Sequence, residues 1–423
     1  MGSAERKEQS LQGNVPNKRA QSQVYLNYAE HEEHLHKENV PNLRFPEFSG
    51  EWEKIKVSDL LEFYPTNSLS WEQLDYSAEG IFNLHYGLIH KGLPTQVDVS
   101  ENNLPTIKDE YIPKKMSLCQ NGDVAFADAS EDTNDVAKCI EFANCNGQKI
   151  ICGLHTIHSR DSINRTIVGF KGYAFAAPAF RQQIRRLAQG TKIYSVSSNN
   201  FAECYIGIPC KEEQSKIANL LLTVDQRIAT QIKIIEKLES LIKGLYERLF
   251  NIDGAAYIQL GNVAKIQKGQ QINGEKLSEI GSYYVMNGGV VPSGYLEDFN
   301  TPANTISISE GGSCGYVQYN SVPFWSGGHC YTLIEPINSF NYKYLFHYLK
   351  FKEQSIMALR IGSCLPNIQK KDLERFPILN VSKEEQDKMA CIFDDILDRI
   401  ICERQIALKY EEQKKYLLSN LFI

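Results

Sequence analysis

The chain has 423 residues, of which 42% are hydrophobic, 10% aromatic and 23% charged, and its formal net charge is −6. This length suffices for two or three domains with sizeable cores, and the composition is that of an ordinary folded protein. The acidic balance excludes a basic field over the whole molecule, so any surface for nucleic acid must be local or shared with a partner.

Cysteine usage and hydropathy indicate the compartment. The eleven cysteines run from Cys119 to Cys402 without any CxxC pair, which fits reduced thiols better than a disulfide framework or a zinc knuckle. We therefore expect no metal site. No stretch approaches the roughly 18 to 20 apolar residues of a membrane span, and MGSAERKEQS lacks the apolar core of a secretory signal. We expect a cytoplasmic protein without a membrane partner.

Residues 1–41 are polar and predict a disordered N-terminal tail. Three histidines lie close together in it, at His31, His34 and His36. A metal ion could bind there, but nothing periodic or apolar surrounds them, which favours a solvated segment.

Two globular segments follow, at 42–206 and 251–380, and they open alike. Ile55, Val57 and Leu60 in the first correspond to Ile258, Leu260 and Val263 in the second. Each segment mixes short β-like runs and Gly-rich turns with a helical stretch near its end, at 179–190 and 342–362. We predict two α+β domains of similar plan and different content.

A long helix follows each segment, within 207–250 and 381–423, and the two helices are copies of one repeat. Lys211–Phe250 aligns without a gap with Lys383–Phe422, and fifteen of the forty positions are identical. Apolar residues step by four and three, the period of a long helix that packs along one seam. The predicted seam residues are Ile217, Leu221, Val224, Ile228, Ile235, Leu238, Ile242, Leu245 and Leu249 in the first copy, and Ile396, Ile400, Leu417 and Leu421 in the second.

Chain length decides how the helices pair. One such helix alone would favour a dimerisation coiled coil, whereas its duplication favours pairing within the chain. A forty-residue helix is about 60 Å long, and only antiparallel packing puts the two ends of the second globular segment side by side. We predict a pseudo-twofold molecule with an intramolecular antiparallel coiled coil. Gln231 and Glu403 are equivalent polar seam positions, which commonly fix register.

The sequence contains no familiar catalytic or nucleotide-binding motif: no GxGxxG after a strand, no GxxxxGK(S/T) and no HExxH. Gly311–Tyr316, GGSCGY, has the glycines of a phosphate loop without its Lys-Ser/Thr pair, which favours a tight turn. The Asn/Asp-Pro-Pro-aromatic tetrapeptide of adenine methyltransferases and the acidic signature of restriction nucleases are also absent. We predict no catalytic residues and a binding subunit rather than an enzyme.

Two local clusters of positive charge are candidates for DNA contacts. The net charge is +5 over Arg160–Glu203 (seven positive, two negative) and +5 over Lys343–Lys371 (six positive, one negative). Each accompanies Gly-rich polar loops that offer groups for phosphates and base edges. A solvated helix face or an ordinary turn is the alternative at any single position. The predicted DNA-binding residues are His155, His158, Arg160, Arg165, Lys171, Arg181 and Arg185, then Lys268, Gln270, Asn273, Ser313, His329, Lys350, Arg360 and Lys370.

These features together resemble the specificity (S) subunits of type I restriction-modification systems. The resemblance rests on LRFPEFSGEW, the KEEQxKIA helix ending in RLF, its second copy ending in NLF and the divergent segments between them, and it covers about Asn42 to Ile423. One departure is that Asp225 is matched by Leu397 in the second copy, which leaves a shared role of this carboxylate unsupported.

The resemblance implies two target recognition domains, each reading one half of a bipartite, asymmetric sequence in double-stranded DNA. It implies that the helices set the spacer between the halves and dock two methyltransferase (M) subunits. S-adenosylmethionine, ATP and Mg are then expected on the M subunits and on any restriction (R) subunits, with no cofactor in this chain.

Two other hypotheses stay open. A non-DNA coiled-coil adaptor with two protein-binding domains would suit the acidic net charge. An enzyme with an unfamiliar active site is disfavoured by the missing motifs.

Overall fold

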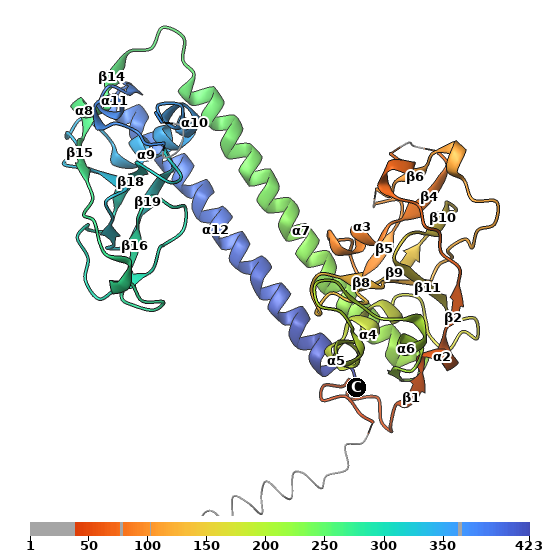
Figure 1. Cartoon of the computed structure of the whole chain (residues 1–423). Helices are drawn as coiled ribbons and strands as arrows, with labels where there is room; N and C mark the ends of the chain where they lie inside the picture. Colours follow the sequence, from red (N-terminus) through yellow and green to blue (C-terminus); the bar gives the residue numbers. More distant parts are fainter. Residues whose placement is uncertain (1–38, 77–78, 102, 363–365) are drawn as a thin grey trace, which may run out of the picture. The chain divides into compact units, whose positions relative to one another are not determined.

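The structure is a computed structural model, and it describes residues 39–76, 79–101, 103–362 and 366–423 (Figure 1). The chain divides into two compact units. Unit 1 comprises the residues up to Gln226 together with Glu411–Ile423, and unit 2 comprises Arg227–Tyr410. Both divisions fall inside the long helices, so each unit contains the start of one helix and the end of the other. Apart from 39–41, the predicted tail lies outside the described residues.

Unit 1 is built on two mixed sheets. The larger has the strand order β2-β11-β7-β9-β5 and the smaller β10-β4-β6-β3, while β1 pairs with β13 and β8 with β12. The strands are β1 (Glu53–Lys56), β2 (Glu62–Tyr64), β3 (Leu74–Asp75), β4 (Ile81–Leu84), β5 (Gln96–Asp98), β6 (Thr106–Ile107), β7 (Val124–Ala127), β8 (Ala129–Ser130), β9 (Cys139–Asn144), β10 (Lys149–Cys152), β11 (Thr156–Arg160), β12 (Tyr194–Ser195) and β13 (Tyr205–Ile208).

Aromatic residues form one part of the unit 1 core. Phe126 of β7 lies 4.5 Å from Phe201, and Phe175 lies 4.8 Å from Phe180, as ring centroids. All four residues of β7 are buried, as expected for a central strand covered on both faces. The short helices are α2 (Val57–Leu60), η1 (Trp71–Gln73), α3 (Tyr86–His90), η2 (Asp109–Tyr111), α4 (Lys171–Ala176), α5 (Pro178–Leu187) and α6 (Ser198–Ala202).

Unit 2 has a four-stranded sheet of order β15-β21-β18-β19, a small sheet β17-β16-β20 and the pair β14-β22. Its strands are β14 (Tyr257–Gln259), β15 (Lys265–Lys268), β16 (Tyr283–Met286), β17 (Tyr295–Leu296), β18 (Thr305–Ser309), β19 (Val317–Asn320), β20 (Trp325–Ser326), β21 (Cys330–Ile334) and β22 (Pro377–Leu379). Its short helices are α8 (Leu260–Val263), η3 (Gly274–Lys276), α9 (Tyr342–Phe351), α10 (Glu353–Met357) and α11 (Lys370–Glu374). The predicted α+β class is confirmed.

The two units repeat one sheet plan. The order β2-β11-β7-β9 in unit 1 corresponds to β15-β21-β18-β19 in unit 2. The registers also correspond, because Ala127 pairs with Thr156 as Ser309 pairs with Cys330. The globular segments therefore share a plan, although their sequences resemble each other only at their openings.

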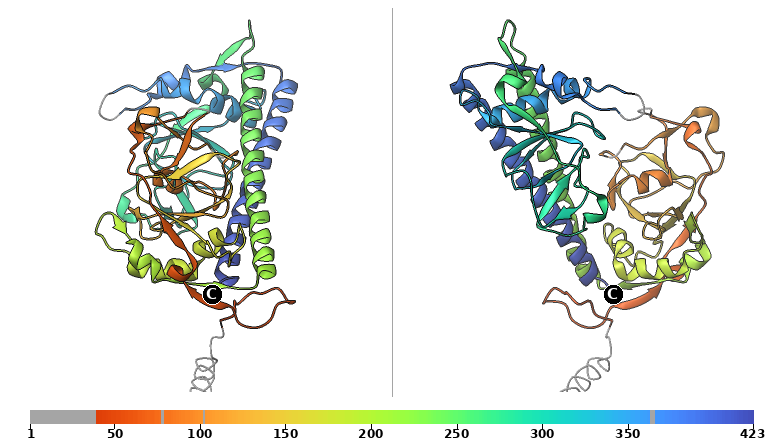
Figure 2. Two further views of the ribbon diagram at one scale, coloured as in Figure 1. Left: turned by 90° about the vertical axis from the view of Figure 1, so that its right-hand side faces the viewer. Right: turned by 60° about the vertical axis from the view of Figure 1, so that its left-hand side comes forward.

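The long helices are α7 (Lys211–Phe250) and α12 (Lys383–Asn420). In unit 1, Asp225 of α7 pairs with Lys414 of α12 at 2.6 Å. In unit 2, the rings of Tyr246 and Phe393 lie 4.6 Å apart. The start of each helix thus lies beside the end of the other, so they run antiparallel (Figure 2).

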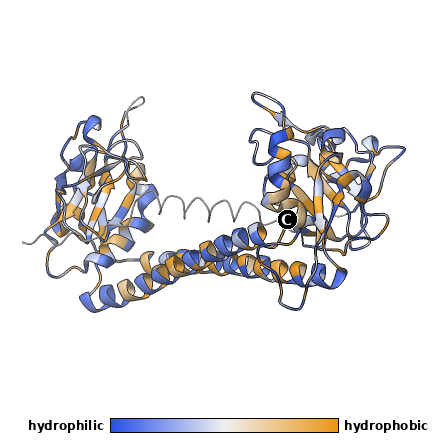
Figure 3. Ribbon diagram, turned by 90° about the horizontal axis from the view of Figure 1, so that it is seen from below, coloured by the Kyte–Doolittle hydropathy of each residue, from blue (hydrophilic) through white to orange (hydrophobic). Residues whose placement is uncertain are grey.

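Apolar residues recur along both helices between hydrophilic ones (Figure 3). Every predicted seam residue is buried or partly buried. The buried ones are Ile217, Leu221, Val224, Ile242, Ile400, Leu417 and Leu421, and the partly buried ones are Ile228, Ile235, Leu238, Leu245, Leu249 and Ile396. No described helix combines the length and apolar character that a bilayer crossing needs.

One identical position of the repeat anchors each long helix at its start. Gln214 accepts a hydrogen bond from Ile167 N at 2.9 Å, and Gln386 accepts one from Asn341 N at 2.7 Å. Both glutamines are buried and also donate to the backbone just before their own helix. The equivalent residues therefore fasten equivalent segments, which explains why Gln occurs in both copies of KEEQ.

A second identical position of the repeat anchors the end of each helix. Phe250, at the end of α7, packs in unit 2 with its ring 5.3 Å from those of Tyr348 and Phe393. Phe422, just after α12, packs in unit 1 with its ring 5.8 Å from Phe170. Each helix therefore begins in one core and ends in the other.

Candidate nucleic-acid interface

Four polar loops of unit 2 meet where the strands of the β15-β21-β18-β19 sheet end. We call this end of the sheet its polar edge. We call residues 268–271, 287–289, 310–313 and 326–329 the loop platform. Gly269 N donates to Cys330 O, and Ser313 N donates to Gly288 O, both at 2.8 Å. Because Glu310 N also donates to His329 O at 2.8 Å, the loops form one connected surface.

Glycine makes this close packing possible. A Cβ on Gly269 would lie 2.2 Å from Gly327 O, and one on Gly288 would lie 2.6 Å from Gly311 O. Gly288 and Gly312 also have φ of +87° and +65°, a backbone conformation that residues other than glycine rarely adopt. The GGSCGY segment is thus a turn, as predicted, within a tightly packed platform.

The platform presents polar side chains to solvent. Lys268, Gln270 and His329 are exposed and Ser313 is partly exposed. Lys268 Nζ lies 2.7 Å from Glu310 Oε1, and Tyr331 donates to the same carboxylate at 3.1 Å. Burial and this carboxylate raise the pKa of Tyr331 to about 12, so it stays a donor. Amide, imidazole and ammonium groups on a rigid surface are suited to contacts with base edges.

Asn273, also predicted, lies two residues beyond the platform and is exposed. Its side chain accepts from Glu275 N at 3.3 Å and caps η3. It therefore has a local structural role beside the platform.

The equivalent edge of unit 1 carries a cluster of histidine and aromatic side chains. His155 is half exposed, and its Nδ1 lies 3.2 Å from Asp128 Oδ1. Burial raises the pKa of Asp128, and His155 opposes that shift. Tyr86 packs edge-on to His155 with centroids 5.3 Å apart, and His90 Nε2 lies 2.9 Å from Ala129 O.

The aromatic cluster continues to an exposed tryptophan. The rings of Trp71 and His85 lie 4.3 Å apart, and Lys91 Nζ lies 5.9 Å from the Trp71 ring centroid. Burial lowers the pKa of His85, which keeps that ring neutral. Trp71, Tyr86, His90 and Lys91 were not predicted, because the short helices η1 and α3 that carry or adjoin them have neither a charge cluster nor a Gly-rich pattern.

The two edges correspond at two pairs of residues. His155 directly precedes β11 and His329 directly precedes the equivalent strand β21, while Asp128 follows β7 and Glu310 follows β18. Asp128 N donates to His155 O at 3.1 Å, as Glu310 N does to His329 O. Two of the predicted residues thus occupy the same place in both units.

Two predicted DNA contacts are wrong because the side chains are buried. His158 is fully buried, and its Nε2 bonds to Asp123 Oδ2 at 2.8 Å. Lys171 is 2% exposed, with its Nζ 3.2 Å from Glu141 Oε1 and 3.0 Å from Thr166 Oγ1. The positive charge of the surrounding sequence predicts surface positions for His158 and Lys171, whereas each of these side chains has a partner inside the core.

The four predicted arginines of unit 1 make contacts within the protein. Arg160 binds Asp123 at 2.7 Å, and its guanidinium lies 4.7 Å from the Tyr64 ring centroid. Arg165 pairs with Glu53.

Arg181 and Arg185 both bond to Asn134, through its carbonyl and its side chain respectively. Burial lowers the pKa of Arg181. These two arginines hold the loop at Asn134, and Arg185 is the more exposed of them.

The remaining predicted residues of unit 2 lie on helices or in the segment that follows α10. Lys350 bonds to Glu353 at 2.6 Å and lies over Tyr316, 4.4 Å from the ring centroid. Lys370 is exposed and pairs with Glu374 at 3.5 Å. Arg360 is exposed.

Comparison with known families matches most of the chain. The type I restriction modification DNA specificity domain matches residues 49–240 and 253–411. A type I specificity subunit of Mycoplasma pneumoniae is 37% identical over 121 residues, and one of Mycoplasma genitalium is 33% identical over 162 residues. These matches cover 28% and 37% of this chain, and 32% and 42% of the relatives' own lengths.

Solved structures share the fold. A type I restriction-modification S subunit from M. genitalium superposes with a TM-score of 0.63 at 20% identity, covering 91% of this chain and 99% of the other. A chain from a structural study of complex assembly and conformational transition in the type I system gives 0.53 at 16% identity, covering 87% and 96%. With two matched domains and this shared fold, the chain belongs to the type I restriction-modification DNA specificity family.

Proposed function

We propose that the chain is the DNA-reading subunit of a type I restriction-modification complex, in which each unit reads one half of a bipartite, asymmetric sequence. The observation that carries the proposal is the correspondence between the two polar edges. His155 with Asp128, and His329 with Glu310, occupy equivalent places on the same sheet plan.

Two units that recognise different half-sites need different side chains on an equivalent backbone arrangement. Unit 1 offers Trp71, Tyr86 and His90 beside His155, whereas unit 2 offers Lys268 and Gln270 beside His329. Phosphate contacts position a protein on DNA, and base contacts select the sequence. We therefore assign selection to these edges and positioning to exposed basic groups such as Arg185, Arg360 and Lys370.

We assign the spacing of the half-sites to α7 and α12. The two helices set the spacer length and dock two M subunits. The M subunits bring S-adenosylmethionine and carry out adenine methylation, and R subunits, where present, bring ATP and Mg. This chain selects the sequence without catalysing either reaction.

Adenine-methylation sequencing tests the proposal. A host that expresses the operon is sequenced with and without this subunit, and one split motif is expected only with it. Replacing residues 42–206 by those of another family member should change one half of the motif and keep the other half and the spacer. An unchanged motif after the exchange would refute separate half-site reading, and no motif at all would favour the adaptor hypothesis.

A second experiment tests the spacing role. Inserting one heptad into both helices lengthens each by about 10 Å and keeps the seam in phase. The spacer should change while both half-sites stay the same. An unchanged spacer would show that the helices do not set it.

A further inference from the structure

Three buried side chains of unit 1 bring potential metal ligands together. Cys119, Cys152 and His158 each offer one ligand atom, and these atoms all lie within 4.8 Å of one another. The residues are 6%, 1% and 0% exposed. They are 33 and 6 positions apart along the chain, so no local spacing of Cys and His could reveal the group.

The sulfurs are placed as they would be around zinc. Cys119 Sγ and Cys152 Sγ are 3.6 Å apart. Two thiolates bound at about 2.3 Å in a tetrahedral site lie about 3.8 Å apart, whereas a disulfide requires an S–S distance of about 2.05 Å. The observed separation is that of a hydrogen bond between two thiols, and it is also close to that of two ligands on one ion.

The carboxylate of Asp123 orients the imidazole of His158. Its Nε2 bonds to Asp123 Oδ2 at 2.8 Å, and Arg160 holds the same carboxylate through two further bonds of 2.7 and 2.8 Å. Nδ1 is buried and no nitrogen or oxygen of the described residues bonds to it, and the second polar neighbour of the ring is the Cys119 thiol. A carboxylate that holds one ring nitrogen while the other is left to coordinate is the usual support of a metal-bound histidine.

The backbone fixes the ligand-bearing segments to one another. Cys119 N donates to Ile150 O at 2.8 Å, and Leu118 forms a bridge with Ile151. Cys152 ends β10 and His158 lies in β11. An ion bound here would join three segments that are otherwise held by strand pairing.

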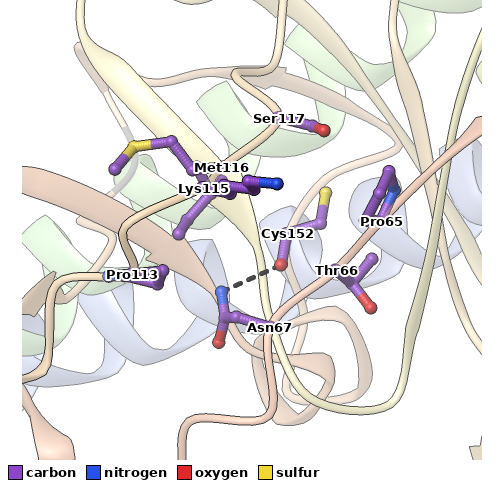
Figure 4. A pocket seen from close by; sticks show the side chains of 9 residues that line it. Pro65, Thr66, Asn67, Pro113, Lys115, Met116, Ser117 and Cys152 are labelled. Carbon is purple, nitrogen blue, oxygen red and sulfur yellow. Dashed lines mark hydrogen bonds between the residues drawn. The ribbon is translucent and has the colours of Figure 1, made fainter.

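A pocket lies beside one residue of the cluster. A pocket of about 140 Å³ is lined by residues that include Cys152, Ser117 and Asn67 (Figure 4). Asn67 Nδ2 donates to Cys152 O at 3.0 Å. Of the three candidate ligands, Cys152 lines this pocket, and it is 1% exposed.

We propose that Cys119, Cys152 and His158 form a zinc-binding site in unit 1, with His158 coordinating through Nδ1 and Asp123 acting as a positioning residue. Thiolate and imidazole are ligands that zinc prefers. The site is independent of DNA reading, so it can be tested with the metal alone.

The test uses the full chain, reduced and freed of metal, and then loaded with Zn²⁺ or with Co²⁺. We expect one zinc retained per chain after dialysis and thiolate-to-cobalt charge-transfer bands in the cobalt form. Zinc should also raise the unfolding temperature of unit 1, since a ligand of the folded state stabilises it. Asp123→Asn should weaken zinc affinity about 10- to 100-fold.

Variants separate the ligands from other buried thiols. Cys119→Ser, Cys152→Ser and His158→Gln should each abolish the stoichiometric zinc, whereas Cys204→Ser, which alters a buried cysteine outside the group, should retain it. If the ligand variants fail to fold, the cobalt spectrum of the unaltered protein decides alone. The proposal is overturned if that protein shows no thiolate bands, if Cys119→Ser binds zinc as Cys204→Ser does, or if a Cys119–Cys152 disulfide forms and its reduction brings no metal uptake.

Discussion

Gln231 of α7 donates a hydrogen bond to Glu403 of α12, and these two residues occupy the same position in the two copies of the repeat, 172 residues apart. In an antiparallel pair of repeated helices, equivalent positions meet only near the centre. The contact therefore marks the centre of the pair. Both side chains are buried, at 7% and 2% exposed, so register at this point depends on a polar contact within an otherwise apolar seam.

We expect the effects of substitutions at Gln231 and Glu403 on the free energy of unfolding to be strongly coupled. Glu403→Leu leaves the Gln231 amide without its acceptor and should cost about 1–3 kcal/mol of unfolding free energy, as should Gln231→Leu. The double variant should be close to the unaltered protein, because neither polar group is then stranded. Urea unfolding of the four proteins measures the coupling. Simple addition of the two single costs would contradict it.

Phe250 and Phe422 should stabilise different units. Each is buried among aromatic rings in one core, so replacement by Ala should cost about 3–5 kcal/mol. Calorimetry should show Phe250→Ala lowering the transition of unit 2 and Phe422→Ala that of unit 1. Tyr416→Ala, at an aromatic residue that is 60% exposed, is the control and should change stability by no more than about 0.5 kcal/mol. A lowering of both transitions by either variant would argue against separate cores.

The equivalent histidines should act on different half-sites. His155→Ala and His329→Ala are each expected to weaken binding by about 1–3 kcal/mol when a base contact is lost, in opposite halves of the target. Binding to DNA duplexes altered in one half at a time, with the M subunits present, measures this. Lys265→Ala, at the far end of β15 from Lys268, serves as the control. Loss spread equally over all DNA sequences would indicate phosphate contacts instead.

Platform geometry should matter as much as its side chains. Gly288→Ala places a Cβ 2.6 Å from Gly311 O at a φ of +87°, which displaces the loop. We expect weaker recognition of the half-site read by unit 2, with the other half unaffected. Gly274→Ala is matched, since a Cβ there has no neighbour within 4 Å. Equal affinity of the two variants would show that the platform does not contact DNA.

The stability of unit 2 should fall in mild acid because of His347. Its Nε2 lies 2.9 Å from Asp394 Oδ1, and its Nδ1 lies 2.9 Å from Tyr246 Oη, so a neutral ring that donates to the carboxylate and accepts from the phenol satisfies both. Burial lowers the pKa of His347, and Asp394 and Lys343 act on it with opposite signs.

Because this pKa lies below that of the unfolded chain, the unfolded state takes up the proton first. The contribution is complete above the unfolded pKa of about 6.5 and is lost as the pH falls through the folded pKa. Denaturant unfolding at a series of pH values should show a steeper loss than for His347→Gln. Parallel curves would mean that His347 does not couple stability to pH.

Periodicity and repetition predicted the helices well, since Lys211–Phe250 and its copy depend on local spacing and on a strong internal comparison. The equivalent sheets were not predicted in detail. Their strands are short, and the correspondence lies in register, such as Ala127 with Thr156 and Ser309 with Cys330, which the amino-acid sequence does not display.

The burial of individual side chains could not be predicted, because residue type does not determine it. Lys171 and His158 follow the same local pattern as exposed basic residues, yet Glu141 and Asp123 hold them in the core. Trp71 and Tyr86 become candidates only when folding places them beside His85 and His155. Cys119, Cys152 and His158 likewise meet only through strand pairing.

The packing of Phe422 has a consequence for biosynthesis. Unit 1 needs Glu411–Ile423 to complete its structure, and Leu43 N donates to Asn420 O at 2.8 Å. A ribosome therefore exposes the first domain long before it makes the residues that close its core. The nascent domain stays open at that face until the last turns of α12 emerge, and a chain terminated within those turns would lack part of unit 1 although unit 2 is complete.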